Sequence, residues 1–295
     1  MTGPGRPPYT SGMPHRRTLG QSFSLEGEGV RCGRRVRVSV EPAAAGAGLV
    51  LASSDLGDEW PLDLAHTVAI AGCTAAGTAE RHVAYIEHFL AACWGAGLSD
   101  ARLTVEGPEL PLLDGSALPW LEAMLAAGLH EYAEPLAPLV VTGTVMVVGE
   151  SAMAAAFPAE EPTMFYLFEH PHPLVGSQLA AFRATPGEFA TDIAPARTFT
   201  TIEEAEYARA HGLLLGGSEE NALIIYPDCL SADPGLPEPF ARHKLLDLIG
   251  DLYLLGRPVQ ASFLAHNTGH RLHRAFAEAL ARHAESGEAQ FLAEG

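Results

Sequence analysis

The segment His243–Gly256, "HKLLDLIGDLYLLG", has the periodicity of a helix. Its leucines, its isoleucine and its tyrosine form one broad apolar flank. At about 100° per residue, His243, Asp247 and Asp251 lie at about 0°, 40° and 80°, which makes a narrow polar stripe on the opposite side. We therefore predict a helix whose polar stripe faces either water or a bound metal ion.

The order of elements around this helix occurs twice along the chain. In each half the pattern predicts a helix that ends in glycine, then a strand, a loop and a second helix. These segments are 82–97, 101–107, 108–116 and 117–128 in the first half, and 243–256, 259–265, 266–270 and 271–283 in the second. Strand-like segments precede both sets, at 18–50 and at 139–149 and 163–170. We interpret this order as an internal duplication of an α+β unit.

The 295 residues are therefore expected to form two domains. The predicted boundaries are a flexible N-terminal tail at 1–17, a first α+β domain at 18–130, a linker at 131–138, a second α+β domain at 139–285, and a C-terminal tail at 286–295. A further helix at 202–212, between turn glycines, indicates an insertion over one face of the second domain.

Charge and composition argue against several classes of function. The net charge is −18; residues 1–40 carry seven Arg and two Glu, a net of +5, so the remaining 255 residues carry −23. Such a surface repels phosphate backbones, and we expect no binding to nucleic acid. We expect a cytoplasmic protein without a transmembrane segment, because no apolar run is long enough for a span and the N-terminus lacks the apolar part of a secretory signal. The four cysteines lack CxxC spacing, which argues against a zinc site built from cysteine.

The first metal-ligand candidates are His243 and Asp247, one helical turn apart, a spacing that lets two side chains bind one ion. Imidazole nitrogen and carboxylate oxygen both suit Zn²⁺. Taken alone, such a pair is more often a surface hydrogen bond. Gly250, beside the pair on the helix, either leaves room next to a metal or lets another backbone pack closely.

A catalytic zinc ion needs about three protein ligands and one open position. The best third candidate is His88 in "YIEH", where Glu87 is a candidate general base for metal-assisted hydrolysis. The alternative is a helix-start glutamate favoured by the helix dipole, followed by a hydrogen-bonded histidine. His270 follows a glycine-containing turn that suits a cleft. The pattern alone does not distinguish it from three other histidines between residues 266 and 283.

Three ordered segments carry a resemblance to a known family. They are "YIEHFLAACWGAGLSDARLTVEGPELPLLDGSALP" (85–119), "ARTFTTIEEAEYARAHGLLLGGSEENALI" (196–224), and "FARHKLLDLIGDLYLLGRP" (240–258) followed by "NTGH" (267–270). Together they resemble the zinc-dependent UDP-3-O-acyl-N-acetylglucosamine deacetylases, which carry out the committed step of lipid A synthesis in Gram-negative bacteria. The resemblance covers about residues 16–285. It is specific, because each short motif lies inside a longer similar stretch.

The resemblance implies a fold and a metal site. The fold has two similar α+β domains, each a sheet packed on two helices, and the helices of both domains are sandwiched at the junction where the active site lies. The implied ligands of Zn²⁺ are His88, His243 and Asp247, and the implied general base is Glu87. The implied substrate is a UDP-linked acylated amino sugar. We expect the enzyme to act as a monomer.

The resemblance also assigns roles to residues around the metal. His270 would be cationic, would stabilise the oxyanion and would donate a proton to the leaving amine, with Asp251 as its partner. Thr198 would help to hold the oxyanion. Lys244 would meet the phosphate or sugar region of the substrate, and Phe199 would lie near the sugar. The insertion near 198–218 would form part of a passage for the acyl chain.

Three motifs depart from the family pattern. The usual "GxGLHSG"-like motif is "GEGVRCG" here, with Arg31 and Cys32 in place of the usual His and a small polar residue. "TVEH" has become "YIEH", and the common Asn after "GH" is replaced within "RLHR". Two alternatives therefore stay open: a deacetylase of another N-acylated amino sugar or sugar nucleotide, and a non-catalytic binding protein on the same fold.

Overall fold

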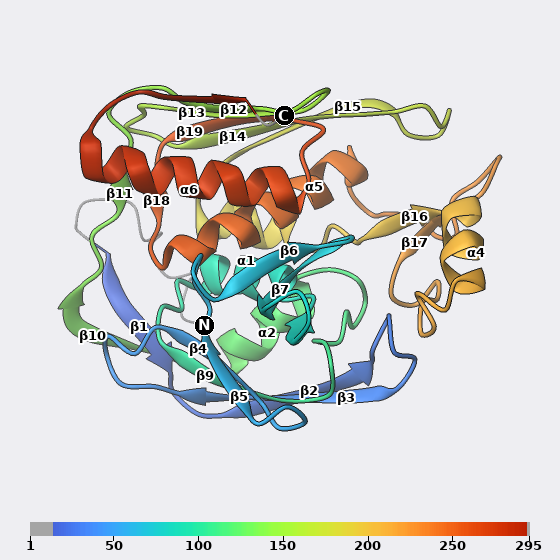
Figure 1. The fold of residues 1–295 in the computed structure, drawn as a ribbon, viewed down its shortest axis with the longest axis horizontal. Helices are drawn as coiled ribbons and strands as arrows, with labels where there is room; N and C mark the ends of the chain where they lie inside the picture. Colours follow the sequence, from blue (N-terminus) through green and yellow to red (C-terminus); the bar gives the residue numbers. More distant parts are fainter. Residues whose placement is uncertain (1–13, 294–295) are drawn as a thin grey trace, which may run out of the picture.

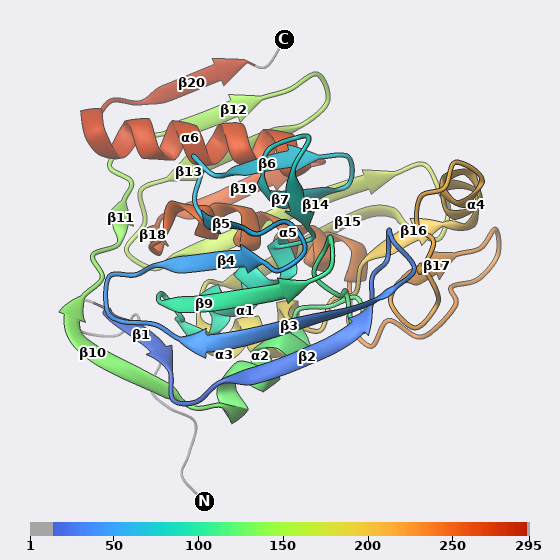
Figure 2. The same ribbon diagram turned by 60° about the horizontal axis from the view of Figure 1, so that its bottom comes forward.

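The computed structural model describes residues 14–293, in which two β-sheets form the outer layers and the main helices lie between them (Figures 1 and 2). The first sheet contains β2 (Phe23–Glu28), β3 (Arg35–Pro42), β9 (Ala101–Glu106), β4 (Leu49–Ser53) and β5 (Asp58–Pro61), in this order. The second sheet contains β15 (Gly176–Arg183), β14 (Thr163–His170), β19 (Ser262–His266), β13 (Met153–Phe157), β12 (Val145–Val148) and β20 (Gln290–Ala293). The helices between the sheets are α1 (Glu87–Ala96), α2 (Leu118–Ala126), α5 (Pro239–Leu252) and α6 (His270–Ser286).

The two sheets repeat one topology. In the first, β9 connects α1 to α2 and pairs parallel with β4 and antiparallel with β3. In the second, β19 connects α5 to α6 and pairs parallel with β14 and antiparallel with β13. The order β2–β3–β9–β4–β5 therefore corresponds to β12–β13–β19–β14–β15, and β20 adds a parallel edge next to β12. The prediction of two similar α+β domains, each with a sheet on two helices, is confirmed.

Alternation along the strands explains why each sheet has one covered face. In β3, Val36, Val38 and Val40 are at most 1 % exposed. Arg35 and Arg37, which alternate with the valines, are exposed. Side chains of a strand point alternately to the two faces of a sheet, so the valines pack inward and the arginines meet water.

Helix α5 begins earlier than predicted and is buried. Pro239 occupies its first turn, where a missing N–H costs nothing, and the predicted start at His243 was therefore one turn too late. The α-helix ends at Leu252, and a short 3₁₀ turn leads to Gly256 at φ 68°, which stops it.

Helix α1 begins later than predicted. Residues 82–84, expected to be helical, form β8 (His82–Ala84), which pairs with β7 (Cys73–Gly77). Tyr85 then adopts φ 60°, which a helix does not allow, so the helix can begin only at Glu87. A short apolar run does not distinguish a strand from a helix by its spacing, which explains the error.

The described ends of the chain are more ordered than the sequence suggested. Residues 1–13 of the predicted tail lie outside the described residues, but β1 (His15–Leu19) pairs antiparallel with β10 (Leu129–Pro135). The predicted linker at 131–138 thus overlaps a strand, whose proline closes it at an edge of the sheet. The predicted tail at 286–295 contains β20. The proposed domain boundary therefore moves to the end of β10.

Two smaller units flank the layers. A three-stranded sheet of β6 (Thr67–Ile70), β7 and β8 reaches α6. The second unit is the predicted insertion, which projects from one end of the molecule (Figure 1). It consists of β16 (Phe199–Thr201), α4 (Ile202–Ala210) and β17 (Leu223–Ile225). Thr201 and Glu204 cap the start of α4 with reciprocal hydrogen bonds.

Four further short elements complete the described chain. They are β11 (Leu139–Val140), which pairs with β18 (Val259–Gln260), and α3 (Pro186–Glu188), which continues into a π-turn at Phe189–Ile193. Over residues 14–293, no helix combines the length and the apolar character that crossing a membrane requires.

Candidate functional site

Helices α1 and α5 approach so closely that their backbones touch at Gly250. A Cβ atom at this position would lie 2.1 Å from the carbonyl oxygen of Glu87. Of the two readings of Gly250, the structure supports close backbone packing, because the space beside the glycine is occupied by α1. This contact carries Glu87 and His88 to the polar stripe of α5.

The polar stripe faces the protein interior. His243, Asp247 and Asp251 are 3, 3 and 1 % exposed. Burying a charge without partners is very unfavourable, so each carboxylate needs a cation or donors nearby. The interpretation of the stripe as a solvated surface is therefore wrong.

The three predicted ligands, His88, His243 and Asp247, converge, and their ligand atoms lie within 4.8 Å of one another. The Nε2 atoms of His88 and His243 are 3.6 and 3.5 Å from Oδ1 of Asp247. Ligands about 2.0–2.2 Å from a tetrahedral ion are roughly 3.3–3.6 Å from each other. The spacing is too long for good hydrogen bonds and fits three ligands around one small cation.

The protonation of His243 suits metal binding. Its Nδ1 donates a hydrogen bond to the carbonyl oxygen of Ala196 (3.1 Å), which leaves Nε2 with a lone pair facing Asp247 and His88. Burial lowers the pKa of His243 to about 3, although Asp247 opposes this effect, so the ring is neutral. His88 Nδ1 is buried without a hydrogen-bond partner among the described residues. Two imidazoles and one carboxylate are a donor set that fits Zn²⁺.

Asp247 is kept ionised by its neighbours. Burial alone would raise its pKa, but Lys244 and His243 hold it well below the usual range. Lys244 Nζ lies 3.0 Å from Asp247 Oδ2 and 5.7 Å from the centre of the Phe199 ring. Burial opposes the charge of Lys244, but Asp247 outweighs it and raises the pKa of the ammonium. The only lysine of the chain thus lies beside a candidate ligand.

Glu87 is a buried carboxyl at the same place. Its Oε2 accepts a hydrogen bond from the backbone N–H of Thr74 (3.0 Å), and the residue is 2 % exposed. Burial raises its pKa to about 7, against the opposing effect of His270 and His88. A carboxyl whose pKa is near neutrality can accept and release a proton during a reaction.

His270 and Asp251 form the predicted pair. His270 Nδ1 donates to Oδ2 of Asp251 (2.8 Å). Burial would lower the pKa of His270, but Asp251 and Glu87 outweigh it and raise the pKa to about 9. Asp251 itself stays ionised, because His270 and His273 hold its pKa at about 2 in spite of burial. His270 is therefore a cation at neutral pH.

One cavity of about 310 Å³ brings these groups together. Of the nine residues predicted for the site, it is lined by every one except Asp251, which lies behind His270: Glu87, His88, Thr198, Phe199, His243, Lys244, Asp247 and His270. The sequence did not indicate six further lining residues: Gly72, Tyr85, Leu112, Phe168, His170 and Glu204.

Thr198 and Phe199 form the wall of the cavity nearest the insertion. The backbone of Thr198 is fixed on both sides, since its N–H donates to Gly115 O (2.7 Å) and its carbonyl accepts from Leu223 (2.8 Å). The ring of Phe199 packs against Phe240 and His243 with centroid distances of 4.7 and 5.8 Å.

A second cavity of about 210 Å³ adjoins the first beneath the insertion. Five residues line both cavities: Gly72, Tyr85, Leu112, Thr198 and Phe199. Most of the other walls are apolar, including Ala205, Leu214 and Ile224. This apolar cavity lies in the segment predicted to form an acyl-chain passage.

Of the altered motif at 27–33, Val30 lines the second cavity. The backbone N–H groups of Arg31 and Cys32 donate to the carboxylate of Glu109, with a shortest distance of 2.8 Å from Cys32. Glu109 is 1 % exposed. Within residues 14–293, neither Arg31 nor Cys32 lines the two cavities, so their substitution does not change the walls around a ligand.

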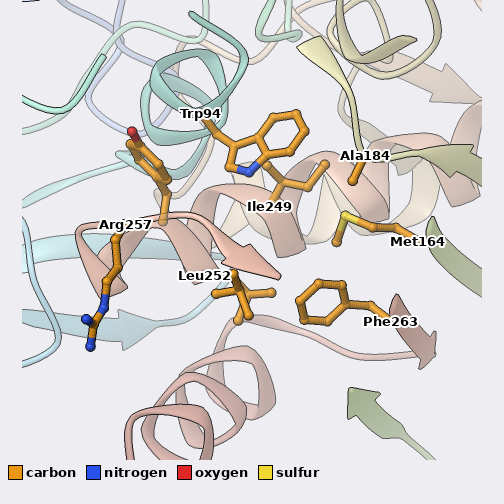
Figure 3. A pocket seen from close by; sticks show the side chains of 9 residues that line it. Trp94, Met164, Ala184, Ile249, Leu252, Arg257 and Phe263 are labelled. Carbon is orange, nitrogen blue, oxygen red and sulfur yellow. The ribbon is translucent and has the colours of Figure 1, made fainter. Parts of the chain in front are cut away.

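A third, narrow gap lies away from this site. Figure 3 shows Trp94, Ile249, Leu252, Met164 and Phe263 facing one another at the end of α5. The gap has a volume of about 20 Å³, which is space for about one water molecule. It is a packing gap in the core, and the side chains that line it include no His, Cys, Asp or Glu that could bind a metal.

His273 and Thr74 are the two hydrogen-bond partners of Asp251 that sequence reasoning missed. His273 Nδ1 donates to Oδ2 of Asp251 at 2.7 Å, and Thr74 Oγ1 donates to Oδ1 at 2.5 Å. The spacing of His270 and His273, three residues apart on one helix, was an available signal. No sequence signal linked Thr74 to Asp251, because 177 residues separate them.

Comparison with known proteins shows which family the chain is similar to. The family model LpxC, UDP-3-O-acyl N-acetylglycosamine deacetylase, matches residues 16–282. The chain is 37 % identical over 276 residues to the UDP-3-O-acyl-N-acetylglucosamine deacetylase of Thermosynechococcus vestitus, which covers 90 % of this chain and 94 % of the relative. It is 38 % identical to the deacetylase of the same name from Nostoc sp. (87 % and 94 % covered) and 35 % identical to that from Myxococcus xanthus (88 % and 83 % covered).

Proposed function

Because the chain belongs to the UDP-3-O-acyl N-acetylglycosamine deacetylase family, we propose that it hydrolyses the N-acetyl amide of a UDP-3-O-acyl-N-acetylglucosamine and releases acetate. The observation that carries this proposal is the buried convergence of His88, His243 and Asp247 beside Glu87 and His270 on one cavity. The reaction belongs to lipid A biosynthesis and takes place in the cytoplasm, with the enzyme acting as a monomer.

His88, His243 and Asp247 would hold one Zn²⁺ ion. When bound, such an ion supplies Lewis acidity toward a carbonyl oxygen and lowers the pKa of water to roughly 7. The neutral Nε2 of His243 and the ionised carboxylate of Asp247 are the protonation states that such an ion requires. Lys244 maintains the second of these states through its ion pair with Asp247.

The proton transfers are assigned to two residues with opposite charge. Glu87 accepts the proton of the attacking water. Its pKa of about 7 suits this role, because the carboxylate is present near neutral pH and can be protonated during turnover. His270 begins as the cation, stabilises negative charge on the former carbonyl oxygen, and then donates a proton to the leaving amine. Asp251 keeps His270 charged and oriented.

The remaining cavity residues bind the substrate. Thr198 is assigned a role in holding the oxyanion, because it lines the cavity of the candidate ligands and its backbone is fixed by two hydrogen bonds. Lys244 and Phe199 are assigned to the sugar and phosphate region. The 3-O-acyl chain enters the apolar cavity beneath the insertion at 198–218, which shares five lining residues with the cavity of the candidate metal ligands.

The test pairs a metal analysis with an acetate-release assay. We expect about one tightly bound zinc ion per chain and acetate release from UDP-3-O-acyl-N-acetylglucosamine. Protein that holds no metal and releases no acetate would contradict the proposal. The same assay on UDP-N-acetylglucosamine without the 3-O-acyl chain tests the substrate: equal rates would favour another N-acylated sugar nucleotide.

A further inference from the structure

Asp251 is held by three hydrogen bonds in the interior of the protein. His270 and His273 both donate Nδ1–H to Oδ2, at 2.8 and 2.7 Å, and Thr74 donates to Oδ1 at 2.5 Å. His273 is 0 % exposed and Asp251 is 1 % exposed. The carboxylate therefore cannot rotate without breaking bonds on both of its oxygens.

The hydrogen-bond partner of Nε2 of His273 indicates which ring nitrogen carries the proton. This Nε2 lies 2.7 Å from the hydroxyl of Thr268. The Tyr166 hydroxyl donates its own proton to the carbonyl oxygen of Thr268 (2.8 Å). The Thr268 hydroxyl has one proton and two acceptors within reach, the Tyr166 hydroxyl at 3.0 Å and His273 Nε2 at 2.7 Å. Because burial disfavours a second proton on the His273 ring, we assign the Thr268 proton to the shorter contact, the one with Nε2. Nε2 is then an acceptor, and the single proton of the ring is on Nδ1, directed at Asp251. His273 is a neutral donor.

The two histidines thus share one oxygen but differ in charge. Burial lowers the pKa of His273 against the effect of Asp251, the opposite of the direction found for His270. Two imidazolium rings with centroids 5.8 Å apart would repel each other. The three groups are also close enough to chelate an ion, but both Nδ1 atoms lie at hydrogen-bond distance from the same oxygen, so they carry protons rather than free lone pairs.

We propose that His273 is a positioning residue for His270: as a neutral donor it fixes the Asp251 carboxylate and through it the orientation of the His270 ring in the cavity. The inference rests on the proposed function, in which His270 donates the proton to the leaving amine. The charged groups that face His270 are Asp251 and Asp247 from α5 and Glu87 from α1. Of these, only Asp251 contacts His273.

Two variants of nearly equal shape isolate the hydrogen bond. In His273→Asn the amide nitrogen takes the place of Nδ1 and can still donate to Asp251, whereas His273→Leu has a similar outline and no donor. The matched control is His283→Leu on the same helix. His283 is also buried and bonded at both nitrogens, to Thr142 N (3.0 Å) and to Glu288 O (2.6 Å), but it is remote from Asp251.

The expected results concern kcat, KM and the alkaline limb of the pH profile. His273→Leu should lower kcat about tenfold to 100-fold, because small misplacements of a reacting group have effects of this size, and should leave KM within about threefold. The alkaline limb should move to higher pH by about half a unit or more. Without the hydrogen bond from residue 273, the charge of Asp251 acts more strongly on His270 and raises the pKa of His270. His273→Asn should keep kcat within about threefold, and His283→Leu should lower only thermal stability.

Three outcomes would overturn the inference: equal losses of kcat in the Asn and Leu variants, a His273→Leu variant with unchanged kcat and alkaline limb, or a similar loss of kcat in His283→Leu. A readout independent of activity is ¹⁵N NMR of the wild-type histidines. His273 should stay neutral with its proton on Nδ1 between pH 6 and 9, and a doubly protonated His273 at pH 7 would overturn the inference. Wild-type protein that binds zinc but releases no acetate would instead overturn the proposed function.

Discussion

The substitution Gly250→Ala tests whether the contact between α1 and α5 positions the site. An added Cβ would lie 2.1 Å from Glu87 O, 2.9 Å from its carbonyl carbon and 3.2 Å from its Cα. Real Cβ atoms essentially never approach closer than 3.0 Å, so the backbones of α1 and α5 must separate by at least about 0.9 Å at this contact. The blocking atoms belong to the backbone and cannot rotate away. Since this backbone carries Glu87 and His88, the predicted base and one predicted ligand would move together.

The expected loss is about 100-fold in kcat/KM, the effect of displacing a catalytic group by about 1 Å. Overpacking costs about 1–3 kcal/mol, and the helix preference for Ala over Gly returns about 1 kcal/mol, so the free energy of unfolding should fall by roughly 0–2 kcal/mol. The assays are acetate release, zinc affinity by competition with a chelator, and thermal unfolding.

The control for this substitution is Gly187→Ala, where a Cβ meets nothing within 4 Å. It should leave kcat/KM unchanged. If Gly250→Ala is stabilised by about 1 kcal/mol and keeps its activity, α1 does not depend on this contact and the reasoning is refuted.

Three other predictions follow from the same groups. Glu87→Ala should keep zinc and lose about 10²–10⁴ of kcat, as metal analysis and acetate release will measure; normal turnover would remove Glu87 as the base. The value of kcat/KM should rise as pH passes through about 7, where Glu87 loses its proton, or somewhat lower because a bound cation favours the Glu87 carboxylate. It should fall again as pH passes through about 9, where His270 loses its proton. A His270→Gln variant that keeps the fall at high pH would refute the assignment to His270. Chelation should lower the melting temperature by removing a ligand of the native state, and His243→Ala should abolish this dependence; a melting temperature that chelators do not change would argue against a metal at this site.

The element order and most of the site residues could be predicted because they depend on local signals. The period of α5 and the one-turn spacing of His243 and Asp247 can be read within five residues. The pattern also offered His88 and His270 as candidates from other segments, the resemblance assigned their roles, and both line the cavity with the first pair. The duplicated order of helix, strand and helix was visible for the same reason.

The remaining features depend on contacts between distant segments or on single backbone angles. Tyr85 follows β8 with φ 60°, an angle that residues other than glycine rarely adopt and that no local sequence signal indicates. The bond from Thr74 to Asp251 crosses 177 residues. The predicted linker overlaps the end of β10, a strand that ends at Pro135 and pairs with β1, more than 100 residues away in the sequence. Sequence patterns report what a segment buries, but not which segment it is buried against.

The duplicated fold explains why the candidate site lies where it does and why it is asymmetric. By topology α1 corresponds to α5, since each precedes the central strand of its own sheet. These equivalent helices meet each other at Gly250 and Glu87, so the contact between the two repeats is also the place where their polar residues converge. The two copies contribute different groups: α1 provides Glu87 and His88, whereas α5 provides His243, Asp247 and Asp251. Neither domain holds three ligands, so a metal at this site would bind across the interface and stabilise the packing of one repeat on the other.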